Sequence, residues 1–592
     1  MKCLSKHLTA LRTFKARCAV LISVGCLSVP TVGFATSTPA SPEPATGWQT
    51  KTEITATRFM AVTAHPQATD AAVSILREGG TAVDAAIAAQ LVLNLVEPQS
   101  SGIGGGAFML YWDAAKSEMT SIDGRETAPL AAQDDYFQDV SGGLVKWQEA
   151  RAGARAVGVP GTLRLLESAH ERFGRIEWSR LFAPATKLAE VGFPVSARLA
   201  KSIDGAATLL RRSAPTREYF FTPDDVPLPE GHWLKNPEFA RSLRQIAIGG
   251  ADVFYRGEIG QEILESLKNS DGPDALMTAE DLSEYRAILR PPVCAPYRTV
   301  VVCGMGPPSS GALTVGQILG LLERFDLASP DAKSIHLIAE ASRLAYADRA
   351  KYMADADFVA VPTQGLLDRN YLNQRSGLIE TEKSMGKATP GSPPGAPLAL
   401  SSMRQPEAAG TSHISIVDQY GSVVSMTTTI ESGFGSGLMA GGFLLNNEMT
   451  DFSFKSETQG NPIANRVEGG KRPRSSMAPT IVLDTRGEPL LVAGSPGGSR
   501  IICYVTQALI SILDWGMTPQ TAVSMPHFCN RNGPTELEAG KDTEALRTAL
   551  ETLGHGVRER EMNSGLHIIQ RRPDGRLSAG IDPRREGTAA GE

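Results

Sequence analysis

The sequence predicts a layered α+β fold. Paired strands follow one another densely after residue 411, whereas amphipathic helices dominate between residues 158 and 380. The 58 glycines and 38 prolines are dispersed along the 592-residue chain, which indicates many tight turns and not a disordered tract. Such a pattern is typical of α+β or layered α/β proteins, in which helices cover the faces of sheets. A chain of this length forms either one very large domain or two intimately packed halves.

The first half of the globular chain begins near Met60 and is expected to be mainly helical. Apolar spacing and the Gly79-Gly80 break indicate two consecutive helices, and a glycine cluster at residues 102–106 leads into a strand. The expected elements are helices over 71–77 and 82–96, a strand over 107–112 and a helix around 334–349. No internal repeat is found in the sequence.

The second half is expected to be rich in hairpins. Alternating apolar residues on both sides of short Gly- and Asp-containing turns predict three of them, and a helix is expected over about 500–513. The hairpins pair 413–417 with 422–429, 480–484 with 489–493, and 567–570 with 576–580. A proline-rich loose linker over 386–409 separates the two halves and ends at Gly410.

The N-terminus is typical of an export signal. Basic residues precede an apolar stretch over 18–29, and Gly33-Phe34-Ala35 offers small residues for cleavage. The apolar stretch is too short to span a bilayer, and no other segment resembles a membrane span. We therefore predict a signal peptide over 1–35, a flexible leader over 36–58, and a secreted, periplasmic product. Lipidation at Cys26 stays open.

Charge and cysteine content restrict the partners and leave the disulfides open. The net charge is −6 and no basic tract follows the N-terminal region, which argues against nucleic acid and anionic membranes as partners. Removal of the signal would leave four cysteines, Cys294, Cys303, Cys503 and Cys529, which allow three pairings or buried free thiols. No HExxH or CxxC motif occurs and the nine histidines are scattered, so no metal site is predicted.

Gly410-Thr411 has the composition that a self-cleaving junction needs. A glycine leaves its carbonyl sterically open, and the following threonine hydroxyl can attack it and shift the acyl group from nitrogen to oxygen. After hydrolysis, the new α-amine of Thr411, with an ordinary pKa of about 8, could act as the general base for its own hydroxyl. Alone, the dipeptide is a weak signal, because Gly-Thr is common and an ordinary threonine at the start of a strand is the better interpretation of it. The hypothesis divides the chain into 59–410 and 411–592.

Several ordered sequence blocks resemble the γ-glutamyltransferase family of N-terminal nucleophile hydrolases. The blocks that carry the resemblance are Gly104–Met109, Asp123–Glu126, Thr411–Asp418, Leu445–Ser453, Lys471–Thr480 and Gly494–Arg500. They stand in the family's order and with nearly its spacing, over about residues 58–585. The resemblance implies a four-layer αββα sandwich, self-cleaved into a heterodimer of a large and a small subunit. It implies no cofactor.

The resemblance also implies donors and acceptors, and roles for the matched residues. Glutathione and other γ-glutamyl amides would be the donors, with water or an amino acid or peptide as the acceptor. Thr411 would be the nucleophile, supported by Thr429, and the backbone of Gly497 and Gly498 would bind the oxyanion. The residues expected to hold the substrate are Arg125, Ser475 and Ser476 at its α-carboxylate, and Glu448 and Asp451 at its α-ammonium.

Three features depart from the family pattern. Glu431 stands beside the nucleophile where transpeptidating members commonly have asparagine. The segments 431–448 and 451–475 are shorter than in the family, the second where a lid covers the site. With an acceptor-only carboxylate and a more open cleft, hydrolysis is expected to exceed transpeptidation.

Three other interpretations compete with the main one. An acylase that removes glutaryl side chains, as in cephalosporin acylases, would use the same nucleophile. A non-catalytic periplasmic binding protein of the same fold is disfavoured by the presence of Thr411, Thr429, Gly497 and Gly498. Dinucleotide binding through the glycines at 102–106 fails because they precede a strand and do not link a strand to a helix.

Overall fold

The computed structural model describes residues 47–592 except 140, 274, 398 and 403–409. The predicted signal peptide, Cys26 and the first part of the leader lie outside the described residues. Among the residues that are described, no helix is both long enough and apolar enough to cross a membrane.

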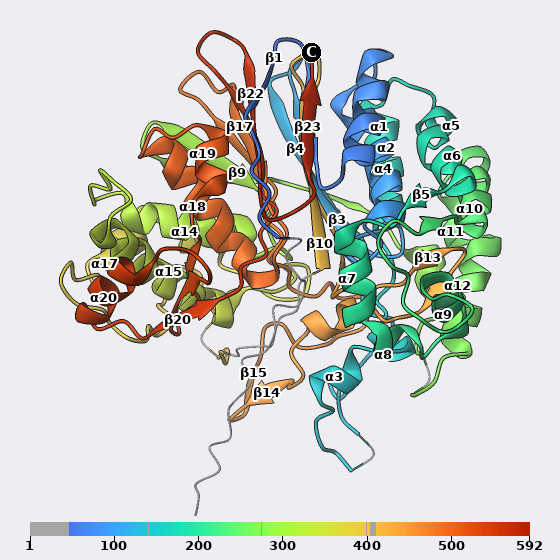
Figure 1. The fold of residues 1–592 in the computed structure, drawn as a ribbon. Helices are drawn as coiled ribbons and strands as arrows, with labels where there is room; N and C mark the ends of the chain where they lie inside the picture. The colour runs from blue at the N-terminus through green and yellow to red at the C-terminus, as the bar shows by residue number, and fades with distance from the viewer. Residues whose placement is uncertain (1–46, 140, 274, 398, 403–409) are drawn as a thin grey trace, which may run out of the picture. The chain divides into compact units, whose positions relative to one another are not determined.

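Two seven-stranded antiparallel sheets form the centre of the molecule (Figure 1). The strands of the first sheet, in spatial order, are β1 (Ile54–Ala56), β22 (Leu577–Ile581), β21 (His567–Arg571), β17 (Pro489–Gly494), β16 (Thr480–Leu483), β9 (Val300–Gly304) and β8 (Val293–Tyr297). The strands of the second sheet are β23 (Thr588–Gly591), β2 (Met60–Thr63), β10 (Gly410–Val417), β11 (Val423–Glu431), β3 (Gly106–Asp113), β4 (Glu118–Gly124) and β7 (Ile288–Arg290).

The sheets pack face to face because their strands carry apolar side chains on both faces. Along β10, Ile414 and Ile416 join the apolar core shared with the helices outside the second sheet, while Val417 joins the core between the two sheets. Met60 of β2 and Ile569 of β21 belong to that inner core as well. Strand residues alternate between faces, so a single hairpin contributes to two layers of core.

Helices cover the outer face of each sheet, and the molecule therefore has four layers, αββα. The main helices over the second sheet are α1 (Pro66–Arg77), α2 (Ala82–Val96), α4 (Thr162–Phe173), α6 (Ala183–Val191), α7 (Ala197–Gly205), α10 (Pro237–Gly249) and α12 (Glu258–Lys268). Those over the first sheet are α14 (Gly311–Leu322), α15 (Ala332–Tyr352), α17 (Arg369–Ser376), α18 (Ile501–Leu513), α19 (Pro519–Ser524) and α20 (Glu544–Thr552).

The three predicted hairpins are confirmed as β10–β11, β16–β17 and β21–β22. The predicted helix over 82–96 is α2 with the same bounds, and Thr81 and Asp84 form a capping box at its start. The strand predicted over 107–112 is β3, one residue longer at each end.

The leader prediction is wrong in its last part. Residues 54–56 form β1, which pairs with Leu577–Ala579 of β22 and extends the first sheet. Pairing satisfies the backbone groups of this segment and buries Ala56, which fixes a segment that sequence composition alone does not mark as ordered.

The cysteines that the sequence left unassigned form two disulfides. Cys294 of β8 is bonded to Cys303 of β9, which lies opposite it in the hairpin, and Cys503 of α18 is bonded to Cys529. Both bonds lie in or against the first sheet and its helices.

Candidate active site

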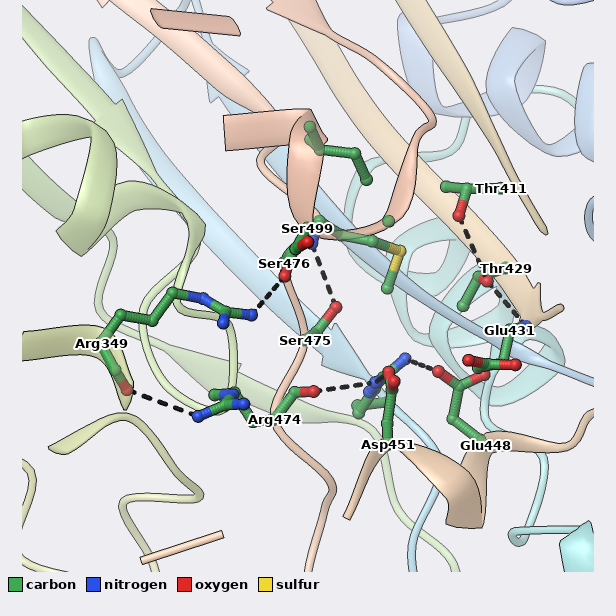
Figure 2. Close-up of a pocket in the computed structure, with 14 residues that line it drawn as sticks. Arg349, Thr411, Thr429, Glu431, Glu448, Asp451, Arg474, Ser475, Ser476 and Ser499 are labelled. Carbon is green, nitrogen blue, oxygen red and sulfur yellow. Dashed lines mark hydrogen bonds and ion pairs between the residues drawn. The ribbon is translucent and has the colours of Figure 1, made fainter. Parts of the chain in front are cut away.

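The predicted site residues converge on one pocket at the ends of the central strands (Figure 2). Nine of the ten predicted site residues line it, although they come from six separate segments of the chain. The complete lining is Arg125, Arg349, Thr411, Thr429, Glu431, Glu448, Asp451, Arg474, Ser475, Ser476, Met477, Gly498, Ser499 and Ile501. Gly497 is absent from this lining and directly precedes Gly498.

Thr411 and Thr429 face each other across the β10–β11 pair. The Thr411 hydroxyl donates to Thr429 Oγ1 at 3.4 Å, and the Thr429 hydroxyl donates to the carbonyl of Gly410 at 2.5 Å. The register shifts between Gly410 and Thr411, which moves this carbonyl off the regular ladder. A hydroxyl has one proton, so Thr429 polarises the Gly410 carbonyl and accepts from Thr411.

The glycines before β3 allow the chain to approach this hairpin closely. A Cβ atom on Gly105 would lie 2.0 Å from the Thr429 carbonyl oxygen, and one on Gly104 would lie 2.1 Å from the carbonyl oxygen of Leu444. Only glycine fits either position. The cluster therefore has a packing role beside the β10–β11 hairpin, and it precedes a strand, unlike the glycines of a dinucleotide site.

Glu431 ends β11 in a strained backbone conformation. Its φ is +75°, which is rare for a residue with a side chain, and its N–H donates to Thr429 Oγ1 at 2.8 Å. One carboxyl oxygen accepts from Asn447 Nδ2 at 2.7 Å, while the buried Oε1 has no partner among the described residues. Burial, with the Asp451 charge nearby, raises the pKa of Glu431 to about 8. A raised pKa favours the neutral, protonated form of this carboxyl in the uncleaved chain, and in that form it can donate a hydrogen bond as well as accept one.

Arg125 directly follows β4 and is almost completely buried. Its guanidinium forms ion pairs with Glu448 and, at 2.6 Å, with Asp451, and its Nε donates to the carbonyl of Pro473 at 3.1 Å. Burial alone would lower its pKa, but Glu448, Asp451 and Glu126 raise it above the ordinary value. The three residues predicted to hold the two charges of an α-amino acid are thus in direct contact with one another.

Three carboxyl groups surround the single guanidinium of Arg125. Glu126 is buried beside it, with Oε2 3.7 Å from the guanidinium, and burial raises the Glu126 pKa to about 7. Burial also raises the pKa of Glu448 well above its ordinary value. The Oε2 atom of Glu448 is buried and has no hydrogen-bond partner among the described residues. A ligand that brings positive charge and N–H groups would satisfy this cluster.

Ser475 and Ser476 lie just before β16 and are positioned differently. The Ser475 hydroxyl accepts from the Met477 N–H at 3.1 Å. The Ser476 hydroxyl accepts from Arg349 Nη2 at 2.5 Å, and Arg349 Nε donates to Ser310 at 2.9 Å. Arg349, on α15, therefore fixes one of the two predicted serines.

Gly497 and Gly498 form the turn that leads from β17 into α18. Both have positive φ, +135° and +58°, and Gly498 starts the short 3₁₀ helix Gly498–Arg500. N–H groups at the start of a helical segment point outward, which suits an oxyanion. A side chain on Gly497 would lie 2.6 Å from the Tyr504 ring, so this turn requires glycine for both conformation and space.

Comparisons with known proteins agree with this geometry. Residues 68–592 match the sequence model of the family described as gamma-glutamyltranspeptidase. This chain belongs to that family. The glutathione hydrolase proenzyme of Bacillus subtilis strain 168 is 36% identical over 546 residues, covering 90% of this chain and 91% of the relative. The glutathione hydrolase proenzyme of Escherichia coli strain K12 is 35% identical over 588 residues, covering 97% of this chain and 98% of the relative.

A solved structure supports the fold over nearly the whole chain. The cephalosporin acylase from Bacillus halodurans superposes with a TM-score of 0.80 at 26% identity, covering 94% of this chain and 99% of that one. The αββα arrangement described above is thus the N-terminal nucleophile hydrolase sandwich, as the family resemblance implied. This chain is an enzyme of the γ-glutamyltranspeptidase family.

Sequence reasoning missed part of the pocket. Arg474 stands inside a matched block, next to Ser475, and could have been found from that position. Arg349 lies on a helix whose sequence gives no sign of the site, and only the fold brings it there. Met477, Ser499 and Ile501 each adjoin or closely follow a predicted residue.

One group of residue types that bind metals lies in the described part of the chain. Ligand atoms of His336, Glu340 and His555 are within 4.8 Å of one another. His336 Nδ1 and His555 Nε2 are hydrogen-bonded directly at 2.7 Å, and Arg343 donates to Glu340 at 2.8 Å. These contacts and the nearby guanidinium satisfy the group without a cation, and we assign no metal to it.

Proposed function

We propose that this chain is a γ-glutamyl hydrolase and transpeptidase that matures by cleaving itself between Gly410 and Thr411. The observation that carries the proposal is the pocket in which Arg125, paired with Glu448 and Asp451, faces the hydroxyls of Thr411 and Thr429. This arrangement joins a recognition site for both charges of an α-amino acid to a nucleophile. Figure 2 shows Glu448 and Asp451 on the same pocket as Thr411 and Thr429.

Maturation begins at the hydrogen bond between Thr429 and the Gly410 carbonyl. The Thr411 Oγ attacks the Gly410 carbonyl carbon, its hydroxyl proton passes to the amide nitrogen, and the C–N bond breaks as the acyl group moves to oxygen. Water then hydrolyses the ester, which leaves a carboxylate on Gly410 and a free α-amine on Thr411. The 2.5 Å hydrogen bond from Thr429 polarises the carbonyl and stabilises the charge that develops on its oxygen.

Substrate binding exchanges ion pairs that already exist. The α-carboxylate of a γ-glutamyl donor takes the place of the acids on Arg125, and its α-ammonium takes the place of Arg125 beside Glu448 and Asp451. Because one set of buried pairs replaces another, the exchange contributes selectivity for a zwitterion more than affinity. Ser475 and Ser476 complete the hydrogen bonds of the carboxylate.

The chemical step uses the threonine that cleavage has freed. The α-amine of Thr411 accepts the proton of its own hydroxyl, and the hydroxyl oxygen attacks the γ-carbonyl carbon. Backbone N–H groups at Gly497 and Gly498 stabilise the oxyanion. The C–N bond breaks, the amine leaves with the proton, and water or an acceptor amine then releases the γ-glutamyl group from Thr411.

A glutaryl acylase is the second candidate, and the similarity to a cephalosporin acylase structure favours it. A glutaryl group has no α-ammonium, so it would leave Glu448 and Asp451 without a cationic ligand in the pocket. The acids next to Arg125 therefore favour the γ-glutamyl donor.

Rates on γ-glutamyl-p-nitroanilide and glutaryl-p-nitroanilide test the choice of donor. We expect the purified enzyme to cleave the γ-glutamyl compound at least tenfold faster. Asp451→Asn should reduce that preference, because it removes one charge facing the ammonium. Faster cleavage of the glutaryl compound by the unaltered enzyme would refute the γ-glutamyl assignment.

We infer further that water is the main acceptor and that the enzyme is exported. The short 451–475 segment, where the family has a lid, supports access of water to the ester on Thr411. The basic and apolar N-terminus and the two disulfides support an oxidising location such as the periplasm. Product analysis with and without glycylglycine tests the first inference, and mostly transferred product would contradict it. Fractionation of cells tests the second, with enzyme retained in the cytoplasm as the contrary result.

A further inference from the structure

The oxyanion turn, residues 496–499, contains the two glycines that are proposed to bind the oxyanion. Gly497 and Gly498 are adjacent, both have positive φ, and neither has a side chain that could be anchored. Glycine has more backbone freedom than any other residue, so a glycine pair does not fix the direction of its own N–H groups. Oxyanion donors must nevertheless lie about 2.7–3.1 Å from the reacting oxygen. The residues on either side of the glycines must therefore hold the turn in place.

Serines stand at both ends of the oxyanion turn. Before the glycines, the Ser495 hydroxyl donates to the carbonyl of Pro496 at 2.7 Å and accepts from the N–H of Gly565 at 3.2 Å. After them, Ser499 is buried and lines the nucleophile pocket (Figure 2). The first end is thus fixed to backbone groups, whereas the second end depends on side chains from distant parts of the chain.

Ser499 is held at its side chain and at its carbonyl. Arg531 Nη1 donates to the Ser499 hydroxyl at 2.5 Å, and the Tyr346 hydroxyl donates to the Ser499 carbonyl at 2.5 Å. Tyr346 belongs to α15, and Arg531 to the turn between β18 (Phe528–Asn530) and β19 (Thr535–Glu538). A hydrogen bond from a charged donor is roughly twice as strong as one between neutral groups. Arg531 is therefore the stronger of these two anchors.

The Arg531 side chain is itself fixed by a carboxylate. Its Nη2 pairs with Glu536 of β19 at 3.3 Å, and Glu536 also pairs with Arg500 at 2.8 Å and with Arg560 at 3.2 Å. Burial would raise the pKa of Glu536, yet these three arginines lower it to about 2. Glu536 therefore stays ionised at neutral pH and keeps the Arg531 guanidinium beside Ser499.

A disulfide joins the segment that carries Arg531 to the helix that follows the oxyanion turn. Cys529 of β18 precedes Arg531 by two residues, and Cys503 lies in the first turn of α18, which starts at Ile501. Both cysteines are buried. A disulfide restricts the separation of the two segments that it joins. The bond thus keeps Arg531 within reach of Ser499.

We propose that Arg531 is a positioning residue for the oxyanion turn: it holds Ser499 so that the N–H groups of Gly497 and Gly498 point at the oxygen of the tetrahedral intermediate. Arg531 does not line the nucleophile pocket and reaches it through Ser499. This inference rests on the proposed function and adds to it the residue that keeps the oxyanion site in its active shape. Loss of Arg531 should weaken binding of the transition state without weakening binding of the substrate.

Two glutamate-like inhibitors separate these two kinds of binding. L-Glutamate occupies the γ-glutamyl site without forming a bond to Thr411. In L-2-amino-4-boronobutanoic acid a boronic acid replaces the γ-carboxyl group, and the Thr411 Oγ adds to boron as its proton passes to the α-amine. The tetrahedral boronate carries a negative charge and resembles the intermediate, so it needs the oxyanion site. The readout is the ratio of Ki for the boronate to Ki for glutamate.

We expect Arg531→Met to raise this ratio by about tenfold. It should lower kcat for L-γ-glutamyl-p-nitroanilide by about tenfold to a hundredfold, at or below the effect of removing one oxyanion donor outright. KM should change by less than about threefold. Arg531→Lys keeps a cationic donor and should recover most of the loss. The matched control is Arg560→Met, which removes a different arginine from Glu536 and should leave the ratio unchanged.

Ser499→Ala is a second, smaller change that removes the group through which Arg531 acts. It should raise the ratio as Arg531→Met does. The variant with both changes should be no worse than either single variant, because both remove the same hydrogen bond. Independent effects that multiply in the double variant would show that Arg531 acts by another route and would overturn the inference.

The outcomes separate this inference from the proposed function. If the unaltered enzyme neither cleaves the γ-glutamyl anilide nor binds the boronate more tightly than glutamate, the proposed function itself is wrong. If it does both, and the ratio is the same in Arg531→Met, in Ser499→Ala and in the unaltered enzyme, the inference is overturned. An equal rise of both Ki values would also overturn it, because a general loss of structure has that effect. If Arg531→Met does not fold or mature, the ratio in Ser499→Ala decides alone.

Discussion

At the scale of single residues, the proposed recognition of the donor depends on the shape of the Arg125 side chain. Its planar fork reaches Glu448 and Asp451 at once, whereas a lysine ammonium is a single point charge. We expect Arg125→Lys to lower kcat/KM for a γ-glutamyl donor. The expected fall corresponds to a loss of about 2–4 kcal/mol of transition-state stabilisation, as for a damaged buried charge pair. Steady-state kinetics on the matured variant measure the loss. Arg466→Lys, which alters a partly exposed pair with Glu468, is the matched control, and equal kinetics for both variants would place Arg125 outside the site.

The titration of Glu431 should make the stability of the uncleaved protein toward unfolding depend on pH in a predictable direction. An acid whose pKa is raised on folding, here from 4.5 to about 8, binds more protons in the folded state between these values. The associated stability is present below about pH 4.5 and is lost as the pH rises through 8. In a Thr411→Ala background, which prevents cleavage, the Tm should fall by a few degrees between pH 5.5 and 8.5.

Replacing Glu431 by glutamine removes this titration. The fall in Tm should therefore be smaller in the Thr411→Ala, Glu431→Gln protein than in Thr411→Ala alone, because glutamine stays neutral throughout. Calorimetry at the two pH values measures the difference. The same pH slope in both proteins would show that Glu431 is ionised in the folded state across this range. Glu126, with its pKa raised to about 7, adds a slope common to both proteins.

At the scale of elements, the β10–β11 hairpin sets the geometry of the proposed cleavage. The Thr429 hydroxyl donates to the Gly410 carbonyl. The preceding residue, Thr428, points to the other face of the strand, and its hydroxyl is buried without a partner among the described residues. We expect Thr429→Val to slow cleavage by about 10²–10³-fold, as the loss of an oxyanion donor does. Thr428→Val should cleave at the normal rate. A time course on denaturing gels distinguishes them, and equally fast cleavage of both would remove Thr429 from the mechanism.

The elements that sequence predicts well are those with local signals. The α2 helix has a capping box at Thr81 and a break at Gly79-Gly80, and its predicted bounds match the structure. The hairpins have alternating strands and clear turns. By contrast, β1 has three residues and is fixed by segments near the other end of the chain, chiefly by its pairing with β22. Nothing in its local sequence could have indicated that contact.

In the site, too, residues with a local sequence signal could be predicted, whereas properties that depend on contacts between distant segments could not. Matched blocks gave Thr411, Arg125 and Glu448, and the structure brings them into one pocket. Arg349 could not be found, because an arginine on a helix has no pattern that points to a distant serine. The raised pKa of Glu431 could not be found either, since it results from burial by segments that meet only in the folded chain.

At the scale of the whole molecule, the two pieces that the proposed cut after Gly410 would produce are interleaved. One sheet combines β10, β11 and β23 from the C-terminal piece with β2, β3, β4 and β7 from the N-terminal piece. In this sheet β2 lies between β23 and β10, so strands of one piece are inserted between strands of the other. The other sheet combines β1, β8 and β9 with four strands from the C-terminal piece. Separation would break both sheets and expose the core between them, so we expect the proposed cleavage to leave a heterodimer.

We therefore expect the two pieces to elute together from a gel-filtration column under native conditions. They should separate only in denaturant, because each lacks strands that the other supplies. The Thr411→Ala protein, uncleaved, provides the reference elution volume. Separate elution of folded pieces without denaturant would show that the interleaved sheets do not hold the cleaved enzyme together.

The most direct test is N-terminal sequencing of the smaller piece of the purified, active enzyme, combined with activity assays of Thr411→Ala. We expect the sequence Thr-Ser-His-Ile, which places the cut after Gly410, and a Thr411→Ala protein that is both uncut and inactive. An active uncut chain, or an active enzyme whose smaller piece begins at another residue, would contradict Thr411 as the nucleophile freed by self-cleavage.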